Sequence, residues 1–288
     1  MNALMHIPIE VLKNIGTRIT LFKHFEEKYS RQRFDLLKDT DRPFNIVKET
    51  LKYCDGSLDI ENKVVLEIGP GNSLAIGLIF LACGAKKIYF VDRFKHLFWD
   101  EHDIAFHKKV LEKIEEKKFP FSALATKSVT FTRSGSINFD CDRIEYRFGD
   151  VASLPLDDCS IDCVFSNAVL EHVHSIKEAI NKISRVTRPD GIGIHEIDLR
   201  DHFFRATPLR LLRYPDWLWN LMSWNRPGYT NRLRFSDYFD LFKQASFEIR
   251  KWIVTREYKE NIDETKLNSK FKAYSQGELK KYWPFGFC

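Results

Sequence analysis

The middle of the chain alternates short apolar runs with longer mixed segments. Residues 64–68 form a β-branched run, Val-Val-Leu-Glu-Ile, that is typical of a strand buried on both faces. Residues 74–85 hold the longest apolar run, about half of the ~20 residues that a membrane span needs, which predicts a buried helix. Further strands are predicted at 87–91, 143–148, 161–165 and 192–197, and further helices at 97–118 and 168–185. Strands that alternate with helices predict parallel βαβ units in a doubly wound α/β sheet.

Both ends of the chain follow other patterns. Near the N-terminus, Leu12, Ile15, Ile19 and Phe22 recur at intervals of three and four, which predicts a helix, and Pro43 opens a second one. We expect the first helix to pack on the next domain; a lid over a substrate site is the alternative.

The pattern weakens after the last strand of the alternating region. A helix is predicted at 235–245 and a strand at 247–254, and the tail at 270–288 is expected to supply a short edge strand, where its Pro284 is tolerated. The chain thus divides into an N-terminal helical extension (1–62), a core (63–199), an insertion expected on the substrate side (200–234) and a C-terminal completion of the core (235–288).

Charge is concentrated in one segment. The whole chain of 288 residues carries a net charge of +5, too little for a general nucleic-acid coat. Between Arg200 and Arg234 stand seven Arg, no Lys and two Asp, so this segment alone equals the net excess. The excess therefore predicts an anionic substrate or a contact with a membrane surface.

The cysteines give no sign of a metal site. Six are scattered without a CxxC pair, and Cys159 and Cys163, the one close pair, lack a matching His or Cys cluster, so no metal is expected. The N-terminal sequence has no signal-peptide pattern. We expect a cytoplasmic protein, with a peripheral position at the inner membrane face as the alternative.

A glycine-rich turn follows the first predicted strand. Gly69-Pro70-Gly71 opens the helix at 74–85, where glycines let a ligand approach the backbone and the helix start offers free N–H groups. The third glycine of a dinucleotide fingerprint is absent. Glu67 at the end of the strand would repel a pyrophosphate but attract an ammonium or sulfonium ligand.

Four ordered motifs within residues 60–200 resemble the class I S-adenosylmethionine-dependent methyltransferases, of the methyltransferase type 11-like kind. They are VVLEIGPGNS at 64–73, IYFVD at 88–92, GDVASLPLDDCSIDCVFSNAVLEHV at 149–173 and TRPDGIGIHEIDL at 187–199. The resemblance implies a Rossmann-like, mostly parallel seven-stranded sheet and S-adenosylmethionine as cofactor.

The resemblance also implies which residues hold that cofactor. Glu67 and the glycine-rich turn would line its methionine part, and Asp92 would accept hydrogen bonds from the ribose hydroxyls. Asp150 and its neighbour would lie against the adenine. The full set is Glu67, Gly69, Pro70, Gly71, Asp92, Arg93, Asp150, Val151, Asn167, Ala168 and His172. A helix cap is the alternative for Asp92, a turn residue for Asp150 and a structural role for His172.

The acceptor is expected to offer a hydroxyl. The turn at 166–169 lacks both the Asn-Pro-Pro-aromatic arrangement for planar amino groups and the Pro-Cys nucleophile for cytosine C5. Polar residues gather where the fifth strand ends, the edge at which doubly wound sheets bind ligands. We predict His202 as general base, oriented by Asp198 or Asp201. In the alternative, Asp201 caps the next segment and His202 lies on the surface.

A second resemblance concerns HEIDLRDHF at 195–203 and YTNRLRFSDYFDLF at 229–242. These segments are similar to methyltransferases of bacterial surface-polysaccharide and glycan pathways, which implies a glycan, activated sugar or lipid-linked saccharide as acceptor. Trp side chains stack on sugar faces, and Arg binds carboxylate or phosphate. Substrate contacts are therefore predicted for His195, Arg200, Trp217, Arg232 and Arg234.

Other interpretations of the same segment stay open. Trp217, Trp219 and Trp224 would also suit a small hydrophobic core, and residues 210–217 an amphipathic membrane-surface helix. A lipid, a small metabolite or an RNA is the alternative acceptor, although the nucleic-acid signal is weak. A non-catalytic binding subunit on the same fold is the third interpretation.

Overall fold

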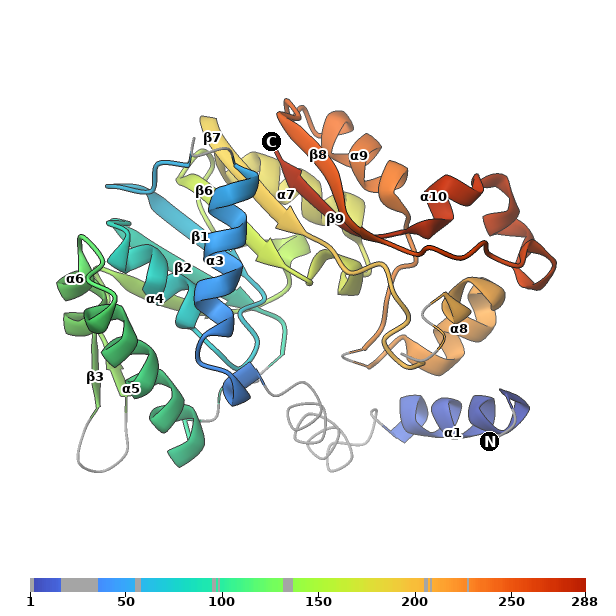
Figure 1. Cartoon of the computed structure of the whole chain (residues 1–288), viewed down its shortest axis with the longest axis horizontal. Coiled ribbons are helices and arrows are strands. Elements are labelled where there is room, and N and C mark those ends of the chain that lie inside the picture. Colours follow the sequence, from blue (N-terminus) through green and yellow to red (C-terminus); the bar gives the residue numbers. More distant parts are fainter. Residues whose placement is uncertain are drawn as a thin grey trace.

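A seven-stranded sheet forms the centre of the molecule (Figure 1). The computed structural model describes residues 3–16, 36–54, 58–94, 97, 99–131, 137–204, 207, 209–226 and 228–288. The strands are β1 (Val64–Ile68), β2 (Lys87–Asp92), β5 (Ile144–Phe148), β6 (Ile161–Asn167), β7 (Thr187–Glu196), β8 (Lys251–Glu257) and β9 (Lys281–Phe287). Their order is β5-β2-β1-β6-β7-β9-β8; the first five are parallel, and β9 is antiparallel to both neighbours. The predicted doubly wound, mostly parallel α/β fold is thereby confirmed.

Helices cover both faces of this sheet. One face carries α3 (Arg42–Tyr53), α4 (Ala75–Ala82), α5 (Glu101–Glu116) and α6 (Ser122–Lys127), and the other α7 (Ile176–Val186) and α9 (Phe235–Gln244). Successive residues of β1 alternate between the two layers, so that Val65 packs towards α4 and Leu66 towards α7. Both faces are thus covered, which is why β1 reads as a continuous apolar run.

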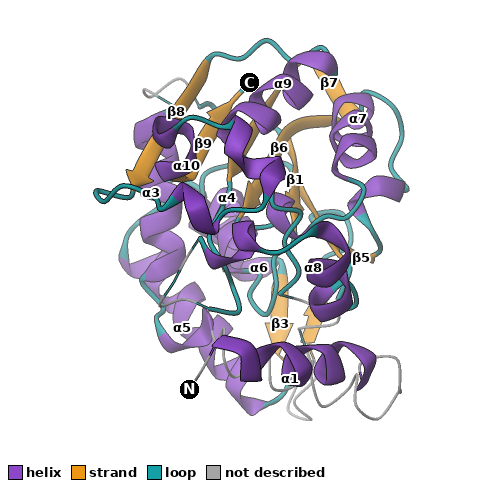
Figure 2. Ribbon diagram, turned by 90° about the vertical axis from the view of Figure 1, so that its right-hand side faces the viewer, coloured by secondary structure: helices purple, strands orange, loops and turns teal. Residues whose placement is uncertain are grey.

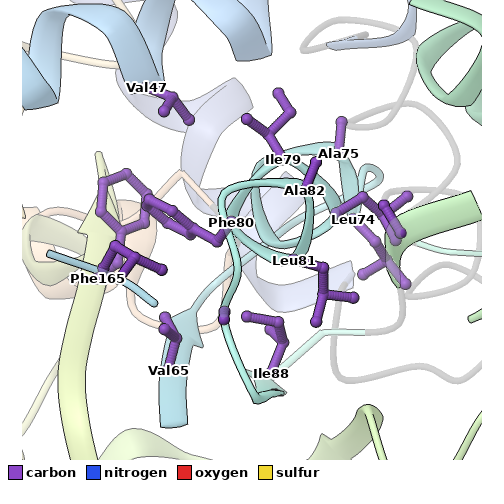
Figure 3. Close-up of a cluster of buried hydrophobic side chains, with 14 of the residues drawn as sticks. Val47, Val65, Leu74, Ala75, Ile79, Phe80, Leu81, Ala82, Ile88 and Phe165 are labelled. Atoms are coloured by element: carbon purple, nitrogen blue, oxygen red, sulfur yellow. The ribbon is translucent and has the colours of Figure 1, made fainter. Parts of the chain in front are cut away.

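Helix α4 lies in the middle of the first layer because its sequence is apolar on every side. Phe80 and Leu81 are fully buried, and Phe80 meets Phe165 of β6 edge to face (Figure 3). Gly77 lets α4 lie close to β2, since a Cβ at this position would come within 2.3 Å of the Phe90 ring on β2. The helix therefore holds the turn that precedes it against the carboxyl end of β1.

A separate small core lies beside the sheet. Its elements are α1 (Ala3–Gly16), η4 (Arg210–Arg213), α8 (Asp216–Ser223), η5 (Glu264–Lys266), η6 (Ser269–Ala273) and α10 (Gln276–Lys280). Trp219, Leu212 and Phe271 are buried at its centre. Figures 1 and 2 both show α1 alongside α8. Trp219 thus belongs to a hydrophobic core, as the alternative interpretation of the Trp residues had it.

The remaining elements are short. A hairpin of β3 (Val129–Phe131) and β4 (Ile137–Phe139) follows α6. The other single turns are η1 (Leu36–Lys38), η2 (Val151–Ser153) and η3 (Leu170–His172). Among the described residues, no helix has both the length and the apolar character to cross a membrane.

The packing face of α1 differs from the predicted one. Leu12 is 67% exposed and Ile15 is 48% exposed, whereas Ile19 and Phe22 lie outside the described residues. The helix packs on the small core with Ile7 and Val11 instead, and Asn14 next to them donates to the Leu221 carbonyl at 2.9 Å. The buried side of α1 is therefore a different one from the side that Leu12 and Ile15 mark.

Two boundaries of the core also differ from the prediction. The helix predicted from 168 begins at Ile176, because Ala168 takes a left-handed backbone with φ 54° and η3 intervenes. Strand β7 begins at Thr187 and includes the predicted turn at 189–191, which an irregular register with β6 accommodates. The first difference brings residues 168–172 to the edge of the sheet.

The order of the C-terminal strands in the sheet differs from the prediction. β9 lies inside the sheet between β7 and β8, and β8 forms the edge. Pro284 is tolerated there because the register with β8 is irregular next to it, and its carbonyl still accepts the Ile197 N–H at 3.1 Å. β8 also begins four residues later than predicted, at Lys251. This arrangement carries Trp283 to the ligand side of the sheet.

Candidate functional site

A cavity of about 1040 Å³ opens at the carboxyl ends of the parallel strands. It lies where β1 has β2 on one side and β6 on the other, the point at which the strand order reverses. Its lining comes from the turn after β1, the ends of β2, β6 and β7, and residues of η3 and α3. This volume is at the upper end for small-molecule sites.

The turn after β1 has a backbone that favours glycine. Gly69 and Gly71 both have φ 66°, in the left-handed region. A Cβ on Gly69 would also come within 2.6 Å of the Val169 side chain. The turn and the segment after β6 thus lie so close together that no residue larger than glycine fits at position 69. Both segments line the cavity.

Asp92 fixes this turn from the end of β2. Its Oδ2 accepts the Gly71 N–H at 3.0 Å and its Oδ1 accepts the Phe94 N–H at 2.9 Å. The carboxylate is buried and lines the cavity. The structure therefore brings Asp92 together with Gly69, Pro70 and Gly71 as predicted.

The next strand end adds a second acidic group. Asp150 accepts the Ala152 N–H at 2.9 Å as the cap of η2, and Arg93 lies 3.6 Å from it. Asp150, Val151 and Arg93 all line the cavity. Asp150 thus serves as a turn residue, which was the alternative, and it also lines the cavity, where the predicted role places it.

Glu67 is a buried acid without a hydrogen-bond partner on one oxygen. Its Oε2 finds no donor among the described residues, although the residue lines the cavity. Burial raises the pKa of Glu67 to about 8, an effect to which the charge of Asp92 adds and which the Gly77 backbone N–H opposes. A neutral acid next to an open cavity is well placed to ionise when a cationic ligand enters.

The opposite wall follows β6. Asn167 donates from its side-chain amide to Glu196, and the Ala168 N–H donates to the Glu196 carbonyl at 2.8 Å. His172 lies on η3, where its Nδ1 is 2.5 Å from the Tyr229 carbonyl oxygen. Asn167, Ala168 and His172 line the same cavity as Glu67 and Asp92, as the prediction required.

Past β7, Asp198 and His202 form a pair beside this wall. His202 Nε2 is 3.4 Å from Asp198 Oδ2, and Arg200 donates to both oxygens of Asp198 at 2.7 and 2.8 Å. Although burial alone would raise it, Arg200 and His202 hold the pKa of Asp198 well below its usual range. His202 therefore faces an ionised carboxylate and also lines the cavity.

Asp201 has a different task from Asp198. Its Oδ1 accepts the N–H groups of Phe203 and Phe204 at 2.8 and 2.9 Å, which is the capping role of the alternative interpretation. Burial raises the pKa of Asp201 to about 6. Asp201 lines the cavity, but of the two candidates Asp198 is the one placed to orient His202.

The structure contradicts three of the predicted substrate contacts. His195 is fully buried, with its Nδ1 2.8 Å from Ser166 Oγ and its ring stacked on Phe242, and burial lowers its pKa to about 3. Arg232 and Arg234 are buried as well. Arg232 donates to the carbonyls of Leu211 and Tyr214 and pairs with Asp216, and Arg234 donates to the carbonyls of Leu199, Leu279 and Lys281.

Of the other two predicted contacts, one lines the cavity and one does not. Trp217 is 67% exposed on α8 and does not line the cavity, because α8 turns its other side, with Trp219, into the small core. Arg200 does line the cavity, with its guanidinium 4.8 Å from the centre of the Trp283 ring. Of the five residues, only Arg200 is placed to contact a substrate there.

Most of the described arginines in the segment 200–234 are therefore engaged in contacts inside the protein. Arg226 pairs with Glu10, Arg210 donates to the Tyr214 hydroxyl, and Arg213 is exposed; Arg205 lies outside the described residues. The cavity itself is lined by eight acidic and five basic side chains. The net charge of +5 in the segment 200–234 is thus explained mainly by arginines that bind other parts of the protein, and it is weak support for an anionic ligand.

Arg234→Met is expected to destabilise the fold. The change leaves three carbonyl oxygens without their donor in a buried place, which lowers the free energy of unfolding by about 2 kcal/mol. Urea denaturation measures it, with Arg213→Met as control because that residue is exposed. An unchanged midpoint for Arg234→Met would show that the guanidinium does not hold these carbonyls.

Sequence reasoning missed several lining residues. Glu196 accepts the indole N–H of Trp283, and Arg256 lies on the neighbouring β8. Alternation along the strand predicted at 192–197 places Glu196 and His195 on opposite faces, and this signal could have drawn attention to Glu196. Trp283 carried no local signal, because its place depends on the insertion of β9 between β7 and β8.

Comparison with known proteins agrees with this geometry. Residues 66–194 match the family model described as "Methyltransferase domain". A probable S-adenosylmethionine-dependent methyltransferase of Mycolicibacterium smegmatis is 30% identical over 109 residues, 37% of this chain and 36% of that protein. An uncharacterized 37.1 kDa transposon protein of Streptomyces fradiae is 44% identical over 48 residues, 17% of this chain and 14% of that protein.

Among solved structures, an S-adenosylmethionine-dependent methyltransferase from Mesorhizobium loti is 11% identical to this chain, with a TM-score of 0.48. The likeness covers 87% of this chain and 97% of that one. The chain spans about a third of the length of the mycobacterial relative. The family match covers the turn after β1, Asp92, Asp150 and His172. Residues 66–194 thus resemble a methyltransferase domain, and the likeness to an S-adenosylmethionine-dependent methyltransferase points to S-adenosylmethionine as the cofactor.

Proposed function

We propose that this chain transfers the methyl group of S-adenosylmethionine to a hydroxyl of a glycan, an activated sugar or a lipid-linked saccharide. The observation that carries the proposal is the pair of Asp198 and His202, which lies in the same cavity as the cofactor residues Glu67 and Asp92. An alkyl hydroxyl is a weak nucleophile, and a base oriented by a carboxylate makes it a stronger one.

The transfer would be a single in-line displacement. The acceptor oxygen attacks the methyl carbon, the bond from that carbon to sulfur breaks, and S-adenosylhomocysteine leaves. His202 would take the hydroxyl proton on the ring nitrogen that does not face Asp198, and Asp198 would stabilise the imidazolium that results. Holding both reactants in one cavity supplies a large part of the rate gain.

The charge of the cavity favours a neutral acceptor over an anionic one. Acidic side chains outnumber basic ones in its lining, and Arg200, the predicted contact that remains there, is already paired with Asp198. A sugar hydroxyl without a neighbouring carboxylate or phosphate suits this lining. RNA is disfavoured for the same reason.

Exposed apolar side chains on α1 and α8 support a lipid-linked saccharide within this class. The predicted surface helix at 210–217 is wrong in its residues, because Leu211 and Leu212 are buried. Exposed apolar side chains lie instead on the paired helices α1 and α8 and at the residue that follows α8. They are Ile9, Leu12, Ile15, Trp217, Leu221 and Trp224. Such a surface favours contact with a lipid chain or bilayer.

The acceptor is identified by incubation with methyl-labelled S-adenosylmethionine and a panel of glycans, nucleotide sugars, isoprenoid-linked saccharides, lipids and RNA. We expect label in a neutral saccharide, and more of it in the lipid-linked form than in the free form. Label in RNA or in a lipid without sugar would replace the proposed acceptor, and label in none, with the cofactor bound, would favour a binding subunit.

Glu67→Gln is expected to flatten the pH dependence of cofactor binding. Glu67 has a folded pKa of about 8, so it is neutral in the free protein below that pH. The cationic cofactor favours the ionised form, and binding therefore releases a proton and tightens as pH rises towards 8. Calorimetric titrations between pH 6 and pH 8 measure this dependence.

The cofactor's own amino group titrates in the same range, but equally for both proteins, so the difference between them isolates Glu67. The same shift affects stability in the opposite direction. The unfolded carboxyl ionises first, so Glu67 costs stability as pH rises from about 4.5 through about 8, and Glu67→Gln removes this loss. Parallel affinity curves for the two proteins would contradict the role of Glu67.

A further inference from the structure

Three side chains on the acceptor side form a group with the chemistry of a metal site. Glu171 and His172 come from η3 and His202 from the segment after β7, and one ligand atom of each lies within 4.8 Å of the others. We infer that Glu171, His172 and His202 bind a divalent transition-metal ion. The cysteine pattern could not predict this site, because its donors come from segments thirty residues apart in sequence.

His172 has the tautomer that a metal ligand needs. Its Nδ1 is 2.5 Å from the carbonyl oxygen of Tyr229, which can only accept, so Nδ1 carries the hydrogen. The lone pair is then on Nε2, which lies 3.8 Å from Glu171 Oε1. Metal-binding histidines are held in this way, by a hydrogen bond from the other ring nitrogen to a carbonyl or carboxylate.

Glu171 is the strongest sign that a cation is required here. It is 1% exposed, and neither carboxylate oxygen has a hydrogen-bond donor of ordinary geometry among the described residues. A buried carboxyl without partners is costly unless it is protonated or meets a cation. No ion pair of Glu171 with a Lys or Arg is found among the described residues, and Arg200 and Arg234 are engaged with Asp198 and with backbone carbonyls.

His202 completes the group. Its Nε2 is buried without a hydrogen bond of ordinary geometry, 3.4 Å from Asp198 Oδ2, and its ring meets the His172 ring edge to face at 4.7 Å. Ligand atoms at about 2.0–2.2 Å from one ion are at most about 4.4 Å apart, so small side-chain movements would close the group on it.

Two imidazoles and one carboxylate with an open side suit Zn²⁺ or Fe²⁺ better than Mg²⁺. His172 and His202 line the cavity, so the open positions of the ion would face the acceptor. An ion there lowers the pKa of a bound hydroxyl, and His202 would then act on the acceptor through the ion. This consequence rests on the proposed function, whereas the binding of the ion rests on the three donors alone.

The test is a titration of the metal-stripped, tag-free full chain with Zn²⁺ in the absence of cofactor and acceptor. Calorimetry is expected to show one ion per chain, and Co²⁺ in its place is expected to give the visible absorption of a low-coordinate site. Glu171→Gln and His202→Asn should each lower the affinity at least tenfold. His102→Asn, a change of an exposed histidine on α5, should leave it unchanged.

Thermal unfolding in EDTA keeps the test decisive. Glu171→Gln removes the unpaired acid without changing its size, so this variant should melt no lower than the wild type in EDTA and lose the rise in Tm that Zn²⁺ gives the wild type. Wild-type protein that binds no Zn²⁺, or binds it as tightly in both variants, would overturn the site. Because no methyl transfer is measured, failure of the proposed acceptor would leave this result standing.

Discussion

His202→Ala is expected to lower kcat for methyl transfer by about 10²- to 10⁴-fold, the range for a lost general base. His202 is the imidazole that faces the ionised Asp198 on the acceptor side of the cavity. The residue does not belong to the turn after β1, which is proposed to hold the cofactor, so the affinity for S-adenosylmethionine should stay within about twofold. Single-turnover rates at saturating cofactor, with the acceptor found in the panel, measure the loss.

A matched control is His174→Ala. His174 is close in sequence to the site, but it contacts Arg93 and stacks on Tyr229 at 4.0 Å, outside the pair of Asp198 and His202. We expect this change to reduce kcat far less than His202→Ala. Turnover of His202→Ala within threefold of the wild type would remove His202 from the mechanism.

Asp92→Asn is expected to weaken S-adenosylmethionine binding at least 100-fold. Both carboxylate oxygens accept backbone N–H groups of the surrounding turn, and the carboxylate lines the cavity. Hydrogen bonds to a charged group contribute about 1.5–3 kcal/mol each, and two ribose hydroxyls would lose them. The new amide also presents a donor where Gly71 needs an acceptor, which disturbs the turn.

Asp100→Asn provides the matched control for this prediction. Asp100 also accepts two backbone N–H groups, from His102 and Asp103, but it caps α5 and does not line the cavity. It should lose stability to a similar extent and keep its cofactor affinity. Equal calorimetric affinities for Asp92→Asn and the wild type would contradict the ribose role of Asp92.

The cofactor half of the site was predictable because its signals are local. The turn from Gly69 to Gly71 needs its glycines for their backbone, and Asp92 follows its strand directly, so position in the sequence fixes position in space. Strand β1 has the predicted bounds, since a strand covered on both faces reads as one apolar run.

The acceptor half depends on contacts between distant segments. Arg232 and Arg234 carry the same charge whether they face a ligand or a carbonyl of their own chain, and only the fold decides. Trp283 reaches the cavity because β9 enters the sheet between β7 and β8. Glu171 was hidden within a motif that resembles the family, where nothing local reports that its carboxylate lacks a partner.

The central claim is that the cavity at the end of β1 binds S-adenosylmethionine. Isothermal titration of the full chain with S-adenosylmethionine and with S-adenosylhomocysteine tests it most directly. The account predicts one site per chain for each ligand, mutual competition between them and loss of both signals in Asp92→Asn. Absence of binding by the wild type, or binding that Asp92→Asn leaves unchanged, would contradict it.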